Sequence, residues 1–264
     1  MNKSILSILS LFVFFSWSLI SGCDKASMDS IGETRTSPQG KSGSTARIVV
    51  KGNYLYAVDN TSLKVVNITN PADPSYVRTI DIGFGIETIY PFGDYLFVGS
   101  NMGMFIYGLN DPSNPNQLSA FEHITACDPV IANDSLAFVT LRNNEVCNRW
   151  AETKQIEIIN IQDVFNPTLD IIYPTQTYPY GLDMLDTLLF VCHGSAGVVI
   201  YDINKMVQHQ MNAQVASITG FNLIAYDAIF WQNKLFVIGQ NGFYQFDYSD
   251  IHNITLISSI LKNQ

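Results

Sequence analysis

Charged residues recur at similar places along this chain, each shortly before an apolar segment anchored by a leucine. The acidic ones are Glu87, Asp128, Asp183 and Asp227, and Arg47 holds the corresponding place in the first segment. If these segments line one opening, the side chains form a partial ring of carboxylates with one arginine. Such a ring predicts a site for a cation or a ligand. The alternative is that each carboxylate caps its own loop by accepting backbone N–H groups.

Aromatic residues accompany these charges in the connecting segments. The connections on the same side carry Phe84, Tyr90, Tyr178, Tyr180, Phe221 and Tyr226. Exposed aromatic rings beside carboxylates suit the recognition of sugars or peptides, although such rings also pack between elements. We therefore add Tyr180 and Tyr226 to the candidate ligand-binding residues.

Nucleophiles and metal ligands are sparse, with four cysteines and four histidines in the chain. No pair of cysteines has zinc-site spacing, and the adjacent Cys192 and His193 would point to opposite faces of a strand. Cys127 and Cys147 either form a disulfide or stay free, whereas Cys192 is expected to be a buried apolar residue. We assign no catalytic residue and no cofactor, and leave the identity of any metal open.

An internal repeat of roughly 40–50 residues must position these side chains. Its apolar segments are Leu63–Ile68, Met104–Leu109, Ile156–Ile161, Val198–Ile203 and Phe243–Tyr248. A second register agrees, because Asn or Asp stands two residues before a leucine at Asn53, Asp94, Asp134, Asp186 and Asn233. The two registers indicate five copies.

Turn residues divide each copy into short strands. Asn70-Pro71 recurs as Asp111-Pro112 and Asn166-Pro167, and Asn or Asp before proline initiates a turn. The first copy predicts strands at 48–51, 54–58, 63–68 and 76–82, which is the content of one propeller blade. The fold class is therefore all-β, a β-propeller of about five four-stranded antiparallel blades. A sixth blade from leftover segments is an open alternative.

The segments Leu63–Ile68 and Val198–Ile203 resemble the repeat of the LVIVD family of bacterial propeller-like surface proteins. The copies are degenerate, with Gly108 in place of the usual acidic residue. This resemblance implies a propeller fold and a location in the cell envelope. It implies no defined activity.

The first residues read as a signal peptide, because Lys3 precedes a run of apolar residues that is too short for a membrane span. Leu19-Ile20-Ser21-Gly22-Cys23 resembles the lipobox of bacterial lipoproteins, which implies acylation of Cys23. We predict a lipoprotein signal peptide at 1–22, a flexible Ser- and Gly-rich tether at 23–45 and the propeller at 46–264.

The net charge of −9 argues against nucleic acid as a partner. We expect a lipid-anchored protein of the bacterial cell envelope, at the outer membrane, that acts as a noncatalytic module for binding or scaffolding an unknown protein or glycan. The alternative is a glycan hydrolase or lyase that uses carboxylates at the channel mouth.

Overall fold

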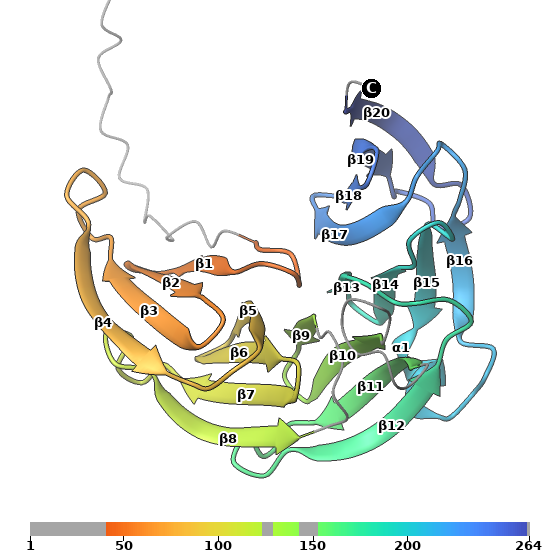
Figure 1. The fold of residues 1–264 in the computed structure, drawn as a ribbon. Coiled ribbons are helices and arrows are strands. Elements are labelled where there is room, and N and C mark those ends of the chain that lie inside the picture. Colours follow the sequence, from red (N-terminus) through yellow and green to blue (C-terminus); the bar gives the residue numbers. More distant parts are fainter. Residues whose placement is uncertain (1–40, 123–128, 143–152, 263–264) are drawn as a thin grey trace, which may run out of the picture. The chain divides into compact units, whose positions relative to one another are not determined.

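Five antiparallel sheets of four strands each make up almost all of the structure, a computed structural model that describes residues 41–122, 129–142 and 153–262. The strands of each sheet are consecutive in the sequence, and the sheets follow one another as the blades of a propeller (Figure 1). Strands β1, β5, β9, β13 and β17 lie innermost. The all-β, five-bladed propeller that the repeat predicts is confirmed.

The blades are numbered in chain order. Blades 1 and 2 consist of β1 (Ile48–Lys51), β2 (Tyr54–Val58), β3 (Ser62–Asn67), β4 (Ser75–Asp81), β5 (Ile86–Phe92), β6 (Tyr95–Ser100), β7 (Gly103–Gly108) and β8 (Asn116–Glu122). Blade 3 consists of β9 (Val130–Ala132), β10 (Leu136–Arg142), β11 (Lys154–Asn160) and β12 (Thr168–Pro174). Blades 4 and 5 consist of β13 (Leu182–Leu185), β14 (Leu188–Cys192), β15 (Val198–Asp202), β16 (Gln214–Ile218), β17 (Ala225–Trp231), β18 (Lys234–Gly239), β19 (Gly242–Asp247) and β20 (Thr255–Leu261).

The alternation of buried and exposed side chains along these segments explains why they form strands. In β3 the side chains of Leu63 and Val65 are fully buried, and Lys64 between them is exposed. Val65 pairs with Tyr56 of β2, so both side chains lie on the face that packs against blade 2. β-branched and aromatic residues favour such half-buried, pleated surfaces.

The turn between the third and fourth strands is also repeated, as the sequence indicates. In blades 1, 2, 3 and 5 an Asn or Asp side chain accepts a backbone N–H two residues later, at Asn70, Asp111, Asp163 and Asp250. Blade 4 instead has the short helix α1 (Ile203–Val207), capped by Asp202. No helix in the described part of the chain is long and apolar enough to cross a bilayer.

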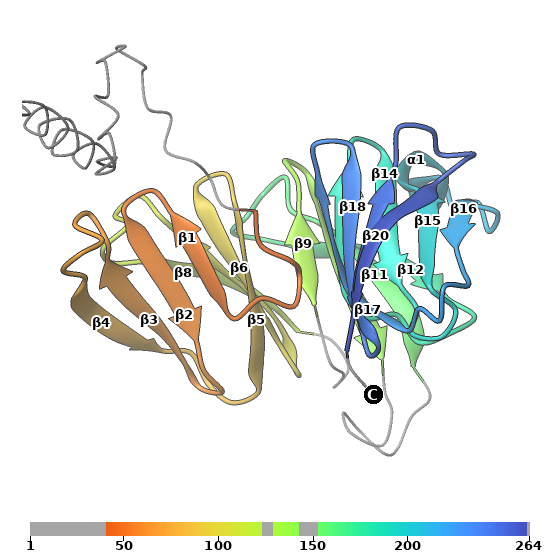
Figure 2. The ribbon, with the colours of Figure 1, turned by 90° about the horizontal axis from the view of Figure 1, so that it is seen from above.

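The buried core of the described residues forms four clusters, one between each pair of consecutive blades. Blades 1 and 5 share no such cluster and stand apart in both views (Figures 1 and 2). Their outward faces keep exposed apolar side chains. Ile238, Phe243 and Ile260 form one row across blade 5, with exposures of 56%, 37% and 73%. Any link between blades 1 and 5 must therefore be of another kind than the packing of buried apolar side chains.

Candidate functional site

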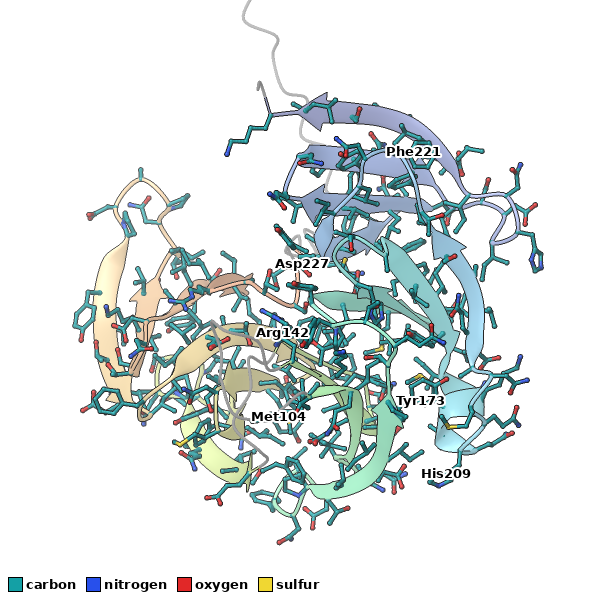
Figure 3. The ribbon with its side chains drawn as sticks, turned by 45° about the vertical axis from the view of Figure 1, so that its right-hand side comes forward. Met104, Arg142, Tyr173, His209, Phe221 and Asp227 are labelled. Atoms are coloured by element: carbon teal, nitrogen blue, oxygen red, sulfur yellow. The ribbon has the colours of Figure 1, made fainter. Side chains whose placement is uncertain are left out.

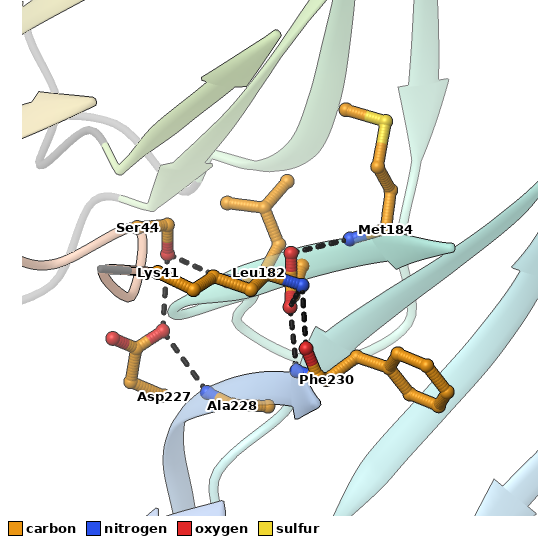
Figure 4. A network of polar contacts seen from close by, with 8 residues as sticks. Lys41, Ser44, Leu182, Met184, Asp227, Ala228 and Phe230 are labelled. Carbon is orange, nitrogen blue, oxygen red and sulfur yellow. Dashed lines mark hydrogen bonds and ion pairs between the residues drawn. The ribbon is translucent and has the colours of Figure 1, made fainter. Parts of the chain in front are cut away.

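Asp227, on the innermost strand β17, lies near the centre of the propeller (Figure 3). Asp183 lies on the innermost strand β13 of the preceding blade, and residues 41–45 make polar contacts with both carboxylates (Figure 4). The other candidate charges lie elsewhere. Glu87 is half-buried on β5, and the exposed Arg47 directly precedes β1. Asp128 lies outside the described residues. The structure thus brings two of the four predicted carboxylates into one site.

Residues 41–45 enter this site from the N-terminal side, and we call them the clasp. Asp227 accepts hydrogen bonds from Thr45 Oγ1 at 2.6 Å, Thr45 N at 3.3 Å and Ser44 Oγ at 3.1 Å. Its fourth donor is the backbone N–H of Ala228, at 3.0 Å. The clasp thus supplies three of the four donors to this carboxylate.

Lys41, at the start of the clasp, meets the second carboxylate. Its Nζ lies 2.5 Å from Asp183 Oδ2 and donates to the backbone carbonyl of Phe230 at 2.7 Å. Asp183 also accepts the backbone N–H groups of Met184 at 2.8 Å and Phe230 at 2.6 Å. The cation that reaches the carboxylates is therefore Lys41, whereas Arg47 is the one that the sequence singles out.

Ser44 connects the two blades through one hydroxyl. It accepts the backbone N–H of Leu182 in β13 at 2.8 Å while it donates to Asp227 in β17. Two glycines make room for this arrangement, because a Cβ at Gly43 or Gly181 would clash with the Asp227 carboxylate. Close approach of the backbone to a buried carboxylate thus explains the glycine at each position.

Burial governs the electrostatics of the pair. The Asp183 and Asp227 side chains are almost inaccessible to solvent, and this desolvation raises the pKa of both carboxyl groups. The Lys41 ammonium opposes the shift at Asp183, and the Thr45 and Ser44 donors oppose it at Asp227. Both carboxylates also accept backbone N–H groups, from the next residue of the same strand and from a distant segment, Phe230 for Asp183 and Thr45 for Asp227.

A second cluster, which we call the aromatic strip, consists of Tyr178, Tyr180, Tyr226, Arg142 and Lys154. The Tyr180 and Tyr226 rings are 5.4 Å apart, and the Arg142 guanidinium lies 4.6 Å from the Tyr180 ring centre. The Lys154 ammonium lies 4.8 Å from the Tyr178 ring centre. Arg142 and Lys154 are paired across β10 and β11, so the strip joins blades 3, 4 and 5.

The remaining aromatic candidates do not join the strip. Phe221 packs on Phe246 instead and lies farther from the centre (Figure 3). Phe84 is 75% exposed in the connection between blades 1 and 2. Tyr90 is largely buried, which raises its pKa, with Asp183 as a further cause.

His193 is a buried neutral imidazole that follows β14. Its Nδ1 lies 3.0 Å from the Thr177 hydroxyl and 3.2 Å from the Thr177 carbonyl oxygen, and its Nε2 lies 3.2 Å from the Tyr201 hydroxyl. Desolvation lowers the pKa of His193 to about 4. Cys192 beside it is fully buried in the core between blades 4 and 5, as an apolar residue would be.

Metal binding can be examined only in the ranges that the structure covers. There, no three His, Cys, Asp or Glu side chains are grouped so as to hold a metal ion. Cys127 and Cys147, the predicted disulfide pair, both lie outside the described residues. The site is thus a set of hydrogen-bonded carboxylates beside an aromatic and cationic surface, which is suited to binding.

Sequence reasoning missed the clasp. Lys41, Ser44 and Thr45 lie in a stretch whose Ser, Gly and Lys composition is typical of a linker and predicts the tether at 23–45. Residues 41–45 instead bind blades 4 and 5, through contacts to residues more than 130 positions away. Composition carries no information on contacts at that separation.

A family model for the LVIVD repeat matches residues 42–81, from the clasp to the end of β4. The matched unit is one blade, and four further four-stranded blades follow it. The matched repeat and the five-bladed propeller together fit an LVIVD-repeat propeller family.

Among curated protein sequences, none matches this LVIVD-repeat propeller. Solved structures are similar in fold. A Lactobacillus plantarum protein has a TM-score of 0.60 at 11% identity, over 80% of this chain and 69% of its own. The computationally designed Ika8 protein has a TM-score of 0.57 at 11% identity, over 81% of this chain and 60% of its own. Chaetomium thermophilum Raptor has a TM-score of 0.60 at 14% identity, over 80% of this chain and 20% of its own. At these identities the likeness concerns the fold alone.

We predict that Ser44→Ala destabilises the LVIVD-repeat propeller by about 1–3 kcal/mol, because Leu182 N–H and Asp227 each lose a buried partner. Urea unfolding measures this loss. Ser42→Ala is the matched control. The buried Ser42 hydroxyl has no hydrogen-bond partner among the described residues, so this change should alter stability by less than about 0.5 kcal/mol. Equal effects of the two changes would contradict the clasp.

The burial of the His193 imidazole predicts that the folded protein loses stability at acidic pH. Because the pKa of His193 falls from 6.5 to about 4 on folding, the unfolded chain binds more protons between these values, and stability decreases as the pH falls. Between pH 7 and 4.5 this loss is about 2–3 kcal/mol. Asp183 and Asp227, with raised pKa values, contribute in the opposite direction over their own range.

The free energy of unfolding of each variant is therefore measured in urea at pH 7 and at pH 4.5, and the loss between the two pH values is compared. His193→Gln should lose less stability on acidification than the parent, and His252→Gln, at an exposed position, should lose as much as the parent. If His193→Gln keeps the full acid sensitivity, the histidine does not govern it.

Proposed function

We propose that this LVIVD-repeat propeller is a noncatalytic binding or scaffold module of the bacterial cell envelope, held at the outer membrane by an acylated Cys23. Its ligand, a glycan or a protein, contacts the aromatic strip. The observation that carries the proposal is that the Tyr180 ring contacts both the Tyr226 ring, at an interplanar angle of 46°, and the Arg142 guanidinium. Paired rings with adjacent donors are typical of surfaces that bind sugars and peptides.

Accessibility and charge support this assignment. Tyr226 is 37% exposed and donates its hydroxyl to Gln240 at 3.1 Å, so its ring is held in one place while it faces solvent. The strip carries two cations, Arg142 and Lys154, on a protein with a net charge of −9. A ligand with carboxylate groups would match these two cationic side chains, which lie against the Tyr180 and Tyr178 rings.

The proposal of a noncatalytic module also rests on the carboxylates. A glycan hydrolase would need two carboxyl groups that face a substrate with no competing partner. Asp183 and Asp227 are instead almost inaccessible, and the clasp binds both. We therefore place the ligand at the strip.

We expect the protein to be retarded by alginate, a linear polyuronate, in affinity electrophoresis, and to be unaffected by neutral dextran. Tyr226→Ala should weaken the alginate retardation on the order of tenfold, because truncation of an aromatic anchor costs about 2 kcal/mol. Tyr76→Ala, at a ring that is 67% exposed on blade 1, is the control and should behave as the parent. Binding that survives Tyr226→Ala unchanged would remove the strip from the proposal.

The anchor is tested separately. Cys23→Ala should release the protein from the membrane fraction or leave it as an uncleaved precursor, because two or three acyl chains on one cysteine would be its strong attachment. Fractionation of expressing cells and the mass of the mature chain report the two outcomes. A correctly cleaved variant that still sediments with membranes contradicts lipid anchoring.

A further inference from the structure

We propose that the pocket occupied by the Lys41 side chain is a binding site for a primary alkylammonium group, filled in cis by the chain's own lysine. A lysine side chain on another polypeptide segment can take the same place. This inference is independent of the aromatic strip and of any ligand bound there.

Three groups around the ammonium define the pocket. The Asp183 carboxylate lies 2.5 Å from Lys41 Nζ, and the Phe230 carbonyl accepts from it at 2.7 Å. The Phe230 ring centre lies 5.8 Å from the same nitrogen. A carboxylate, a carbonyl and an aromatic ring together match the charge and the donor groups of an ammonium ion.

The pocket does not depend on Lys41 for its shape. The backbone N–H groups of Met184 and Phe230 fix the two Asp183 oxygens from β13 and β17 (Figure 4). The Phe230 carbonyl belongs to a paired strand residue. The three groups are therefore preorganised by the innermost strands of two blades, as a binding site requires.

The pocket also demands a cation. The Asp183 side chain is 3% exposed, and a buried carboxylate without a cation is destabilising. Lys41, which supplies the charge, is 26% exposed and belongs to no strand or helix. A segment held mainly through side chains opens locally more easily than a strand in a sheet, so a second ammonium group can reach the pocket.

A neighbouring subsite makes polypeptide the preferred ligand. Three and four residues after Lys41, the hydroxyls of Ser44 and Thr45 bind Asp227. Leu182 N–H adds a donor to the Ser44 hydroxyl. A segment with a lysine followed at this spacing by hydroxyl residues would satisfy both carboxylates, whereas a free amine would satisfy one.

Chemical rescue tests the ammonium pocket in the full chain. Lys41→Ala should lower the melting temperature, and n-butylamine hydrochloride should restore it in a dose-dependent way, because a ligand of the native state raises the transition. The parent protein should not respond, nor should Lys41→Ala with n-butanol. Lys64→Ala, which removes the lysine of an exposed ion pair with Asp59, is the matched control and should not be rescued. Equal shifts in all variants, or none in Lys41→Ala, would overturn the proposal.

A peptide tests the polypeptide part. A fluorescent peptide with the sequence of residues 40–46 should bind the triple variant Lys41→Ala, Ser44→Ala, Thr45→Ala, whose clasp has lost its side-chain contacts to both carboxylates, at a concentration at least about tenfold below that needed with n-butylamine, because two linked subsites bind together. The same peptide with norleucine in place of lysine should not bind. If both peptides bind equally, the ammonium is not what the pocket recognises, and if the lysine peptide is no better than the amine, the ligand is not a polypeptide.

Discussion

The propeller depends on two carboxylates that have lost their contact with water. Asp183 and Asp227 sit on neighbouring innermost strands, and burial of each charge is tolerated only when donors or a cation surround it. Strand N–H groups supply some of these donors, and residues 41–45 supply the rest, including the one cation. Because this clasp directly precedes blade 1, neutralisation of the carboxylates also attaches the first blade to the last two.

This polar contact takes the place of an apolar interface. Consecutive blades share four buried clusters, and the hydrophobic contribution to stability lies there. Blades 1 and 5 have outward faces with exposed apolar residues, among them Val50 and Ile238. Between residues 48–81 and 225–261 no hydrogen bond or ion pair joins the two blades directly. The clasp thus links the first blade to the last two by hydrogen bonds and an ion pair, whereas buried apolar side chains link the consecutive blades.

Much of the fold could be predicted from the sequence, because the fold repeats. Periodic apolar segments indicate strands, and the Asx turns at Asn70 and Asp111 indicate turns. Because the same pattern recurs in each copy of the repeat, every copy supports the assignment of the others. The same logic put Tyr180 and Tyr226 among the candidate residues, and the structure places their rings 5.4 Å apart. It could not find Lys41 or Ser44, which occur once and act across most of the chain. Nor could it find α1, where blade 4 departs from the repeated turn.

Residues 41–45 are a fixed part of the propeller. Hydrogen–deuterium exchange of the full chain, followed by mass spectrometry of peptides from the clasp and from β17, tests this attachment directly. We predict that the amide of Thr45, which donates to Asp227, exchanges orders of magnitude more slowly than that of an unstructured linker. Exchange of the clasp at the intrinsic rate, while β17 stays protected, would show that the propeller holds together without it.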